Sequence, residues 1–190
     1  GIKRKILLFV EWLTYKCATK IYPNSYGLKK FILKNISIPK KKILVIGSGS
    51  SNGIDTDYFN RTEEVEKIAL AYKKKFALNK MFSFIFIGRF VKDKGIEELL
   101  SVFVRLSNKY KDTRLSLLGW EEKDLDPISY KAKKIIASNK KIINLGFKKD
   151  IRSYLAASDC LVLPSYREGF PNVVLQAGSL EVPSIVSDIN

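Results

Sequence analysis

From Phe82 onward, short apolar runs alternate with longer amphipathic segments, and no other feature of the sequence constrains the fold as much. The short runs are typical of buried strands, and the segments between them carry apolar residues at helical spacing. The predicted strands are 82–87, 114–118, 142–145, 160–163 and 184–187, and the predicted helices are 95–109, 127–138, 150–157 and 171–181. Because crossover helices join strands that run in parallel, the sequence predicts the α/β class, with a Rossmann-like parallel sheet and helices on both of its faces.

The region before the alternation predicts an amphipathic helix over residues 2–17, with a basic first turn. Its apolar stripe consists of Ile2, Ile6, Phe9, Val10, Leu13 and Cys17. Contact with an anionic membrane would use both the stripe and the basic turn, whereas packing within a larger domain would use the stripe alone, and this second interpretation is favoured. The same region predicts a helix over 28–33, a strand over 42–46, and a helix over 62–77 that is capped by Thr62 and has Val65, Ile68, Ala69 and Tyr72 on one side.

The composition is that of a folded globular chain with a strongly basic charge, since 46% of its 190 residues are hydrophobic and its formal charge is +15. Residues 1–60 hold eleven lysines and arginines against three acidic residues. Nucleic acid, an anionic membrane and phosphorylated small molecules are therefore the partners to consider. The sequence has no basic and aromatic motif of a nucleic-acid-binding module, so nucleic acid is not an expected partner, and a basic nucleic-acid-binding domain is the less favoured alternative.

The chain contains no histidine, which excludes Ser-His-Asp and Cys-His catalytic sets and most mixed zinc sites within it. Cys17 and Cys160 lie far apart in apolar segments and are predicted to be buried free thiols, as in a reducing cytoplasm. The apolar run 6–10 is much shorter than the roughly twenty residues that span a bilayer. A cytoplasmic location is therefore expected, with any contact at the inner face of the membrane peripheral.

A polar loop follows the predicted strand 160–163, at the sheet edge where open α/β folds bind ligands. Pro171 is placed to begin the next helix, whose free amides favour an anion. These amides belong to Gly169, Phe170, Asn172 and Val173. Glu168 would repel a phosphate, so its expected role is to accept hydrogen bonds from hydroxyl groups. A sugar diphosphate offers both a phosphate and hydroxyl groups.

The loop after strand 82–87 carries a second set of candidate residues. Gly88 allows a tight turn, and Arg89 and Lys94 flank a helix that begins near Gly95. A forked guanidinium and a compact ammonium directed at one place suit two adjacent phosphates. A solvated surface pair is the alternative for Arg89 and Lys94 alone, but a second candidate loop at the same predicted sheet edge favours phosphate binding.

The run Glu168-Gly169-Phe170-Pro171-Asn172, followed by Gln176 and Ala177, resembles the signature of retaining GT-B glycosyltransferases of the large nucleotide-sugar-dependent family. That signature is Glu, seven residues, Glu, in which the first Glu faces the donor sugar and the second holds the ribose. Gln176 stands where the second carboxylate is found, and as a neutral acceptor it forgoes the charge-assisted part of that hydrogen bond. The 88–95 loop is similar to the family's Gly-Arg…Lys-Gly segment, so the resemblance implies that Arg89 and Lys94 bind the donor diphosphate.

The resemblance also implies a division of the chain. Residues 52–55 resemble the segment where the family's first domain passes to the second. Residues 1–60 are thus expected to be the tail of an acceptor-side domain with its linker, and residues 61–190 a nucleotide-sugar-binding domain, half of a GT-B fold, truncated at its C-terminal end. Leu145-Gly146-Phe147 resembles the turn whose main chain reads the base, so Phe147 would act through its backbone. Trp120 is a candidate for stacking on the base.

The function implied by the resemblance is that of the donor-binding portion of a retaining glycosyltransferase of the hexosyltransferase type. It would transfer a sugar from a nucleotide sugar, expected to be UDP-linked, to a glycan or lipid-linked acceptor in bacterial surface polysaccharide assembly. The cations and the helix end would take the place of a metal, so no metal or cofactor is expected. The fragment is expected to be inactive by itself. A non-catalytic nucleotide-sugar-binding module is the alternative, and Gln176 supports it.

Overall fold

The computed structural model describes residues 1–49, 53–122 and 126–189, which form two compact units. The first unit is Gly1–Gly53 with the short segment Gly169–Pro171, and the second is Ile54–Glu168 with 172–189. The chain thus leaves the first unit at Gly53. Part of the predicted interdomain segment 52–55 lies outside the described residues, because Asn52 is among those that are not described.

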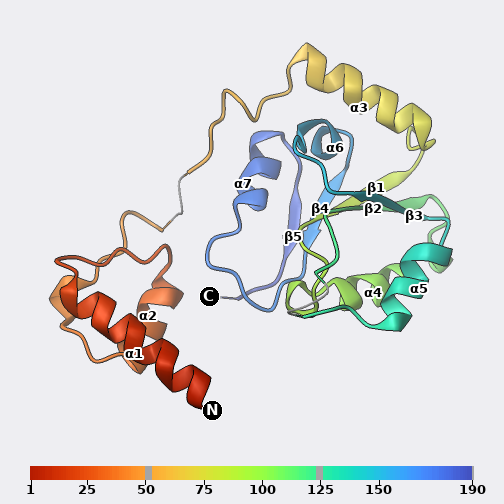
Figure 1. The fold of residues 1–190 in the computed structure, drawn as a ribbon. Coiled ribbons are helices and arrows are strands. Elements are labelled where there is room, and N and C mark those ends of the chain that lie inside the picture. Colours follow the sequence, from red (N-terminus) through yellow and green to blue (C-terminus); the bar gives the residue numbers. More distant parts are fainter. Residues whose placement is uncertain (50–52, 123–125, 190) are drawn as a thin grey trace. The chain divides into compact units, whose positions relative to one another are not determined.

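Five strands of the described residues form one sheet in the second unit, in the order β3-β2-β1-β4-β5 (Figure 1). They are β1 (Phe82–Ile87), β2 (Thr113–Leu118), β3 (Ile142–Gly146), β4 (Cys160–Leu163) and β5 (Ser184–Val186). Each predicted strand is present within two residues of its expected bounds, and every pairing is parallel. The predicted fold class is therefore confirmed.

Helices cover both faces of this sheet (Figure 1). One face carries α4 (Ile96–Lys109) and α5 (Tyr130–Ser138), and the other carries α3 (Glu63–Lys75), α6 (Arg152–Ala156) and α7 (Asn172–Ser179). Consecutive residues of β1 show the two layers, because Phe86 packs with the α4 and α5 side and Ile85 with the α6 and α7 side. Both side chains are fully buried, which is why the strand reads as an apolar run interrupted only by the buried Ser83.

Two helix starts follow from their capping side chains. Thr62 accepts a hydrogen bond from the Val65 amide at 3.3 Å and begins α3, as predicted. The predicted apolar side of α3 is wrong at Ile68, which is 48% exposed, whereas Val65, Ala69 and Tyr72 are buried. The helix predicted from residue 127 begins at Tyr130 instead, where the Ser129 hydroxyl accepts from the Ala132 amide.

The first unit is built from α1 (Ile2–Cys17), α2 (Tyr26–Asn35) and a 3₁₀ turn, η1 (Lys40–Lys42). Its core is a cluster of four isoleucines, Ile21, Ile32, Ile36 and Ile43. The strand predicted over 42–46 is wrong, since Ile43 makes a single parallel bridge to Ile21 and the flanking residues pair with no other described strand. The alternation of buried Ile43 and Val45 with exposed Leu44 and Ile46 is that of a strand, but a strand needs a continuous partner.

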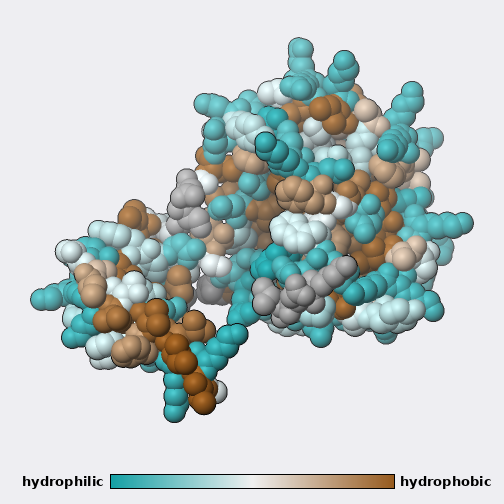
Figure 2. All heavy atoms as spheres, viewed as in Figure 1, coloured by the Kyte–Doolittle hydropathy of each residue, from teal (hydrophilic) through white to brown (hydrophobic). Residues whose placement is uncertain are grey.

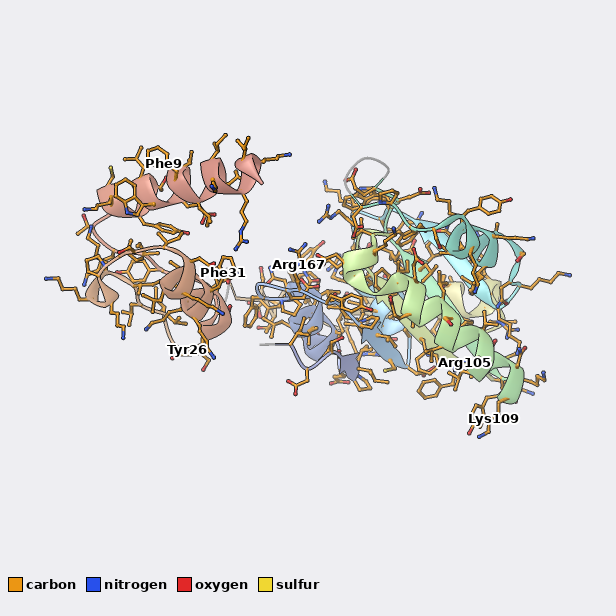
Figure 3. The ribbon with its side chains drawn as sticks, turned by 90° about the horizontal axis from the view of Figure 1, so that it is seen from below. Phe9, Tyr26, Phe31, Arg105, Lys109 and Arg167 are labelled. Atoms are coloured by element: carbon orange, nitrogen blue, oxygen red, sulfur yellow. The ribbon has the colours of Figure 1, made fainter. Side chains whose placement is uncertain are left out.

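The predicted helix over 2–17 is confirmed, and its apolar stripe is exposed (Figure 2). Phe9 projects from the side of α1 that faces away from α2, and 61% of it is exposed (Figure 3). Cys17 is also exposed, so its predicted burial is wrong, whereas Cys160 is buried as predicted. Packing of this stripe within a larger domain, the favoured interpretation, and its contact with an anionic membrane both stay predictions. In the part of the chain that the structure describes, no helix combines the length and the apolar character that crossing a membrane requires.

Candidate functional site

The site lies at the carboxyl edge of the sheet, where β1 and β4 are neighbours. The chain proceeds from β1 to β2 on one side and from β4 to β5 on the other, so the strand order reverses between β1 and β4. In open α/β sheets, ligands bind in the crevice at such a reversal. The two loops that follow these strands carry Arg89, Lys94 and Glu168, which the sequence predicts as site residues.

The structure brings Lys94 and Glu168 into direct contact. Lys94 ends the short 3₁₀ helix η2 (Lys92–Lys94), and its Nζ donates to Glu168 Oε1 at 2.5 Å. The Ser165 hydroxyl donates to the same oxygen at 2.7 Å. The Lys94 side chain is 21% exposed and the Glu168 side chain is 14% exposed, so the ion pair is largely shielded from solvent. Ser165 is not among the site residues predicted from the sequence, because a serine shortly after a strand gives no signal of its own.

Two glycines let the site loops approach closely. Gly95 has φ +65°, and a Cβ built on it would lie 2.0 Å from the Pro164 carbonyl oxygen of the β4 loop. Gly119 has φ +151°, and its Cβ would lie 1.8 Å from the Gly88 carbonyl oxygen of the β1 loop. A side chain at either position would push neighbouring strand ends apart. The loops after β1, β2 and β4 therefore meet through backbone contacts.

A pocket of about 600 Å³ opens at the ends of β2 and β3. Trp120 and Phe147 form one wall, with ring centroids 5.4 Å apart in an edge-to-face arrangement. The Gly119 amide donates to the Gly146 carbonyl at 3.0 Å, which ties the two loops together. Trp120 is 46% exposed and Phe147 is 63% exposed, and two such rings beside main-chain groups can hold a flat heterocycle. Both predicted base-side residues, Trp120 and Phe147, thus line one pocket.

Two charged residues, Glu121 and Lys133, line this pocket and form an ion pair with each other. On the neighbouring β1 loop, Arg89 is 44% exposed and lies 3.9 Å from the Glu122 carboxylate. Neither Glu121 nor Glu122 is among the site residues predicted from the sequence. The structure therefore places Arg89 beside the β2 loop and Lys94 beside the β4 loop. That both cations bind one diphosphate stays a prediction.

The remaining predicted residues lie on or before α7. Asn172 is its first residue, Val173 packs against the core clusters on both faces of the sheet, and Gln176 is partly buried one turn further on. The amides of the first turn are those that a helix leaves without an internal partner. Gly169 and Phe170 group with the first unit, whereas Asn172, Val173 and Gln176 belong to the second.

Perturbed groups near the site owe their shifts to hydrogen bonds. The Tyr166 hydroxyl donates to Glu98 Oε1 at 2.8 Å, and this bond raises the pKa of Tyr166. The Asp93 carboxylate accepts from Arg167 and raises the pKa of that guanidinium. Among the described residues, no three Cys, Asp or Glu side chains are grouped to hold a metal ion. The arrangement can therefore supply cations, hydroxyl acceptors and helix amides to a charged ligand from its own side chains and backbone.

Comparison with known proteins gives a match to the family model described as "Glycosyl transferases group 1" over residues 69–190. The chain is 32% identical over 191 residues to the capsular polysaccharide biosynthesis glycosyltransferase CapM of Staphylococcus aureus, covering 100% of the chain and 48% of CapM. It is 29% identical to an Escherichia coli UDP-Gal:α-D-GlcNAc-diphosphoundecaprenol α-1,3-galactosyltransferase, covering 99% of the chain and 48% of that enzyme. The chain spans about half the length of the curated relatives it matches.

Solved structures with the same fold include Anabaena Alr3699/HepE in complex with UDP and glucose. That structure superimposes with a TM-score of 0.73 at 16% identity, over 94% of this chain and 46% of HepE. At this identity the likeness concerns the fold alone.

Proposed function

Because the chain belongs to the group 1 glycosyltransferases, we propose that its second unit binds a nucleoside diphosphate sugar as the donor half of a retaining glycosyltransferase. One observation carries the proposal. Lys94 and Glu168 are 74 residues apart in the sequence and meet at the strand reversal, and the β1 loop that carries Lys94 also contributes Phe90 to the pocket walled by Trp120 and Phe147. A cation, a carboxylate and aromatic faces match the diphosphate, sugar and base of one ligand.

The chemistry of transfer assigns a task to each group. As the bond between the sugar and the diphosphate breaks, negative charge grows on the departing diphosphate. The Lys94 ammonium, the Arg89 guanidinium and the first amides of α7 would stabilise that charge more in the transition state than in the ground state. Glu168 would accept hydrogen bonds from the sugar hydroxyls and so hold the sugar in place. No protein nucleophile is part of the proposal, and retention would follow from attack on the face that the diphosphate leaves.

The donor and acceptor are proposed from relatives. The name of the Escherichia coli relative specifies a UDP-sugar donor and a diphosphoundecaprenol-linked acceptor. A Campylobacter jejuni relative that is 29% identical is likewise named for a diphospho-undecaprenol acceptor. We propose a UDP-linked donor and a lipid-linked acceptor in surface polysaccharide assembly, at the inner face of the membrane.

A thermal-shift screen tests the proposal. The ligands are UDP, GDP and ADP, the nucleotide sugars of these three diphosphates, and uridine. A ligand that binds the folded chain raises its melting temperature by mass action. We expect UDP and UDP-sugars to raise it and uridine to do so less. The absence of a shift with every nucleoside diphosphate would refute donor binding, and a shift with the nucleotides but no sugar transfer by the protein joined to its acceptor domain would favour the non-catalytic alternative.

Gln176→Glu is expected to maintain or strengthen UDP binding, because a carboxylate is a stronger acceptor for the ribose hydroxyls than an amide oxygen. The gain should be about threefold or less in Kd, since one neutral acceptor is exchanged for a charged one. Calorimetry with UDP measures it. Gln176→Ala is the matched variant, which should weaken binding, and a severe loss with Gln176→Glu would assign Gln176 another role.

A further inference from the structure

Two charged dipeptides face each other across the site, one in each loop. Asp93-Lys94 lies in the β1 loop, and Arg167-Glu168 lies in the β4 loop, where Figure 3 labels Arg167. Arg167 Nε donates to both carboxylate oxygens of Asp93 at 2.9 and 3.1 Å, and Lys94 Nζ donates to Glu168 at 2.5 Å. Each loop therefore presents one acid and one base, in opposite order.

This order permits one register of the two loops. A shift that placed Asp93 opposite Glu168 and Lys94 opposite Arg167 would oppose like charges in both pairs. The backbone supports the observed register, because the Tyr166 amide donates to the Asp93 carbonyl at 2.9 Å. The Asp93 amide in turn donates to Asp126 Oδ2 at 2.8 Å, which anchors Asp93 to the β2 side of the site.

The two pairs differ in exposure, and this difference separates their roles. The Arg167 side chain is 81% exposed, so its pair with Asp93 contributes little to the stability of the fold. The Lys94 and Glu168 side chains are largely shielded and lie at the strand reversal. The exposed Asp93–Arg167 pair is positioned to connect the two loops. The shielded Lys94–Glu168 pair is positioned to contact a ligand.

We propose that Asp93 and Arg167 are positioning residues, whose ion pair fixes the register of the two loops and so sets the place of the Lys94 ammonium for the donor diphosphate. This inference rests on the proposed donor site. Neither side chain is required to touch the ligand. Their effect reaches the diphosphate through Lys94.

The sign of the effect of Asp93→Asn distinguishes positioning from simple electrostatics. Removing a carboxylate near a bound diphosphate would strengthen binding if charge alone mattered. Loss of register would weaken it instead. We expect Asp93→Asn and Arg167→Gln each to raise the Kd for UDP by about three- to fivefold, the range of an exposed ion pair, and the double variant to be no weaker than either.

The experiment is calorimetry of UDP and of uridine on the unaltered chain, the two single variants and the double variant, with melting temperatures measured alongside. Uridine lacks the diphosphate, so its affinity should stay unchanged in all four. Asp150→Asn is the matched control, because it removes the same charge from an ion pair with Arg152 in the β3–α6 connection. It should leave UDP binding unchanged.

The outcomes separate this inference from the proposed function. Tighter UDP binding by Asp93→Asn, additive losses in the double variant, or equal losses for uridine would each overturn the positioning role. The charge-swapped variant Asp93→Arg with Arg167→Asp should recover part of the affinity lost by each swap alone, and failure to recover would contradict the pairing. If the unaltered chain bound no nucleoside diphosphate, the donor site itself would be refuted, and the inference with it.

Discussion

Lys94→Ala is expected to weaken UDP binding by about 2–3 kcal/mol, roughly 30- to 150-fold in Kd, which is the loss typical of a charged hydrogen bond. Two effects act in the same direction. The diphosphate loses its ammonium partner, and the Glu168 carboxylate, which is 14% exposed, loses the cation that offsets its charge beside the phosphate. Isothermal calorimetry with UDP measures the change.

Lys92→Ala is the matched control for this prediction, because Lys92 lies in the same 3₁₀ helix and is exposed. Its loss removes the same charge from the same loop. An exposed lysine outside the site should change UDP binding by about 1 kcal/mol or less. Equal losses in the two variants would mean that the loop acts through its net charge, and Lys94 would lose its assigned role.

Gly95→Ala is expected to lower the free energy of unfolding by about 2–4 kcal/mol. The left-handed backbone at φ +65° costs a residue with a side chain about 1 kcal/mol, and the new Cβ would lie 2.0 Å from the Pro164 carbonyl oxygen. Because that oxygen belongs to the backbone, the β4 loop has to move away from the β1 loop. Urea unfolding gives the change in stability, and calorimetry gives the accompanying loss of UDP affinity.

Gly178→Ala is the control for this backbone effect. Gly178 lies within α7, and a Cβ there would meet no atom within 4 Å apart from its chain neighbours and the backbone of its own helix. Alanine in a helix is favoured over glycine by about 0.5–1 kcal/mol, so this variant should be as stable as the original or more so. If Gly95→Ala proved no less stable than Gly178→Ala, the close approach of the two loops would be wrong.

The sequence predicts the sheet well because the pattern of each strand is local. A short apolar run between two helical segments identifies β1 or β4 without knowledge of its neighbours, and crossover connections then require parallel pairing. Prediction fails where the outcome depends on partners. Residues 42–46 have the alternation of a strand but pair at Ile43 alone, and Cys17 belongs to an apolar stripe that no described residue buries.

The site is predictable in part for the same reason. Lys94 and Glu168 each follow a predicted strand, and parallel strands end at one edge, so their proximity can be expected from the sequence. The direct contact between Lys94 and Glu168 depends on how closely two irregular loops approach each other. The same is true of the ion pair between Asp93 and Arg167. That approach is set by contacts between Gly95 and Pro164 that no local pattern encodes.

The location of a bound nucleotide tests the central claim most directly. A crystal structure of the chain with UDP should show the diphosphate within hydrogen-bonding distance of Lys94 Nζ, and the uracil between the Trp120 and Phe147 wall and the main chain at Gly146. UDP bound at another surface, such as the apolar pocket of Phe82 and Tyr110 at the opposite edge of the sheet, would contradict the claim.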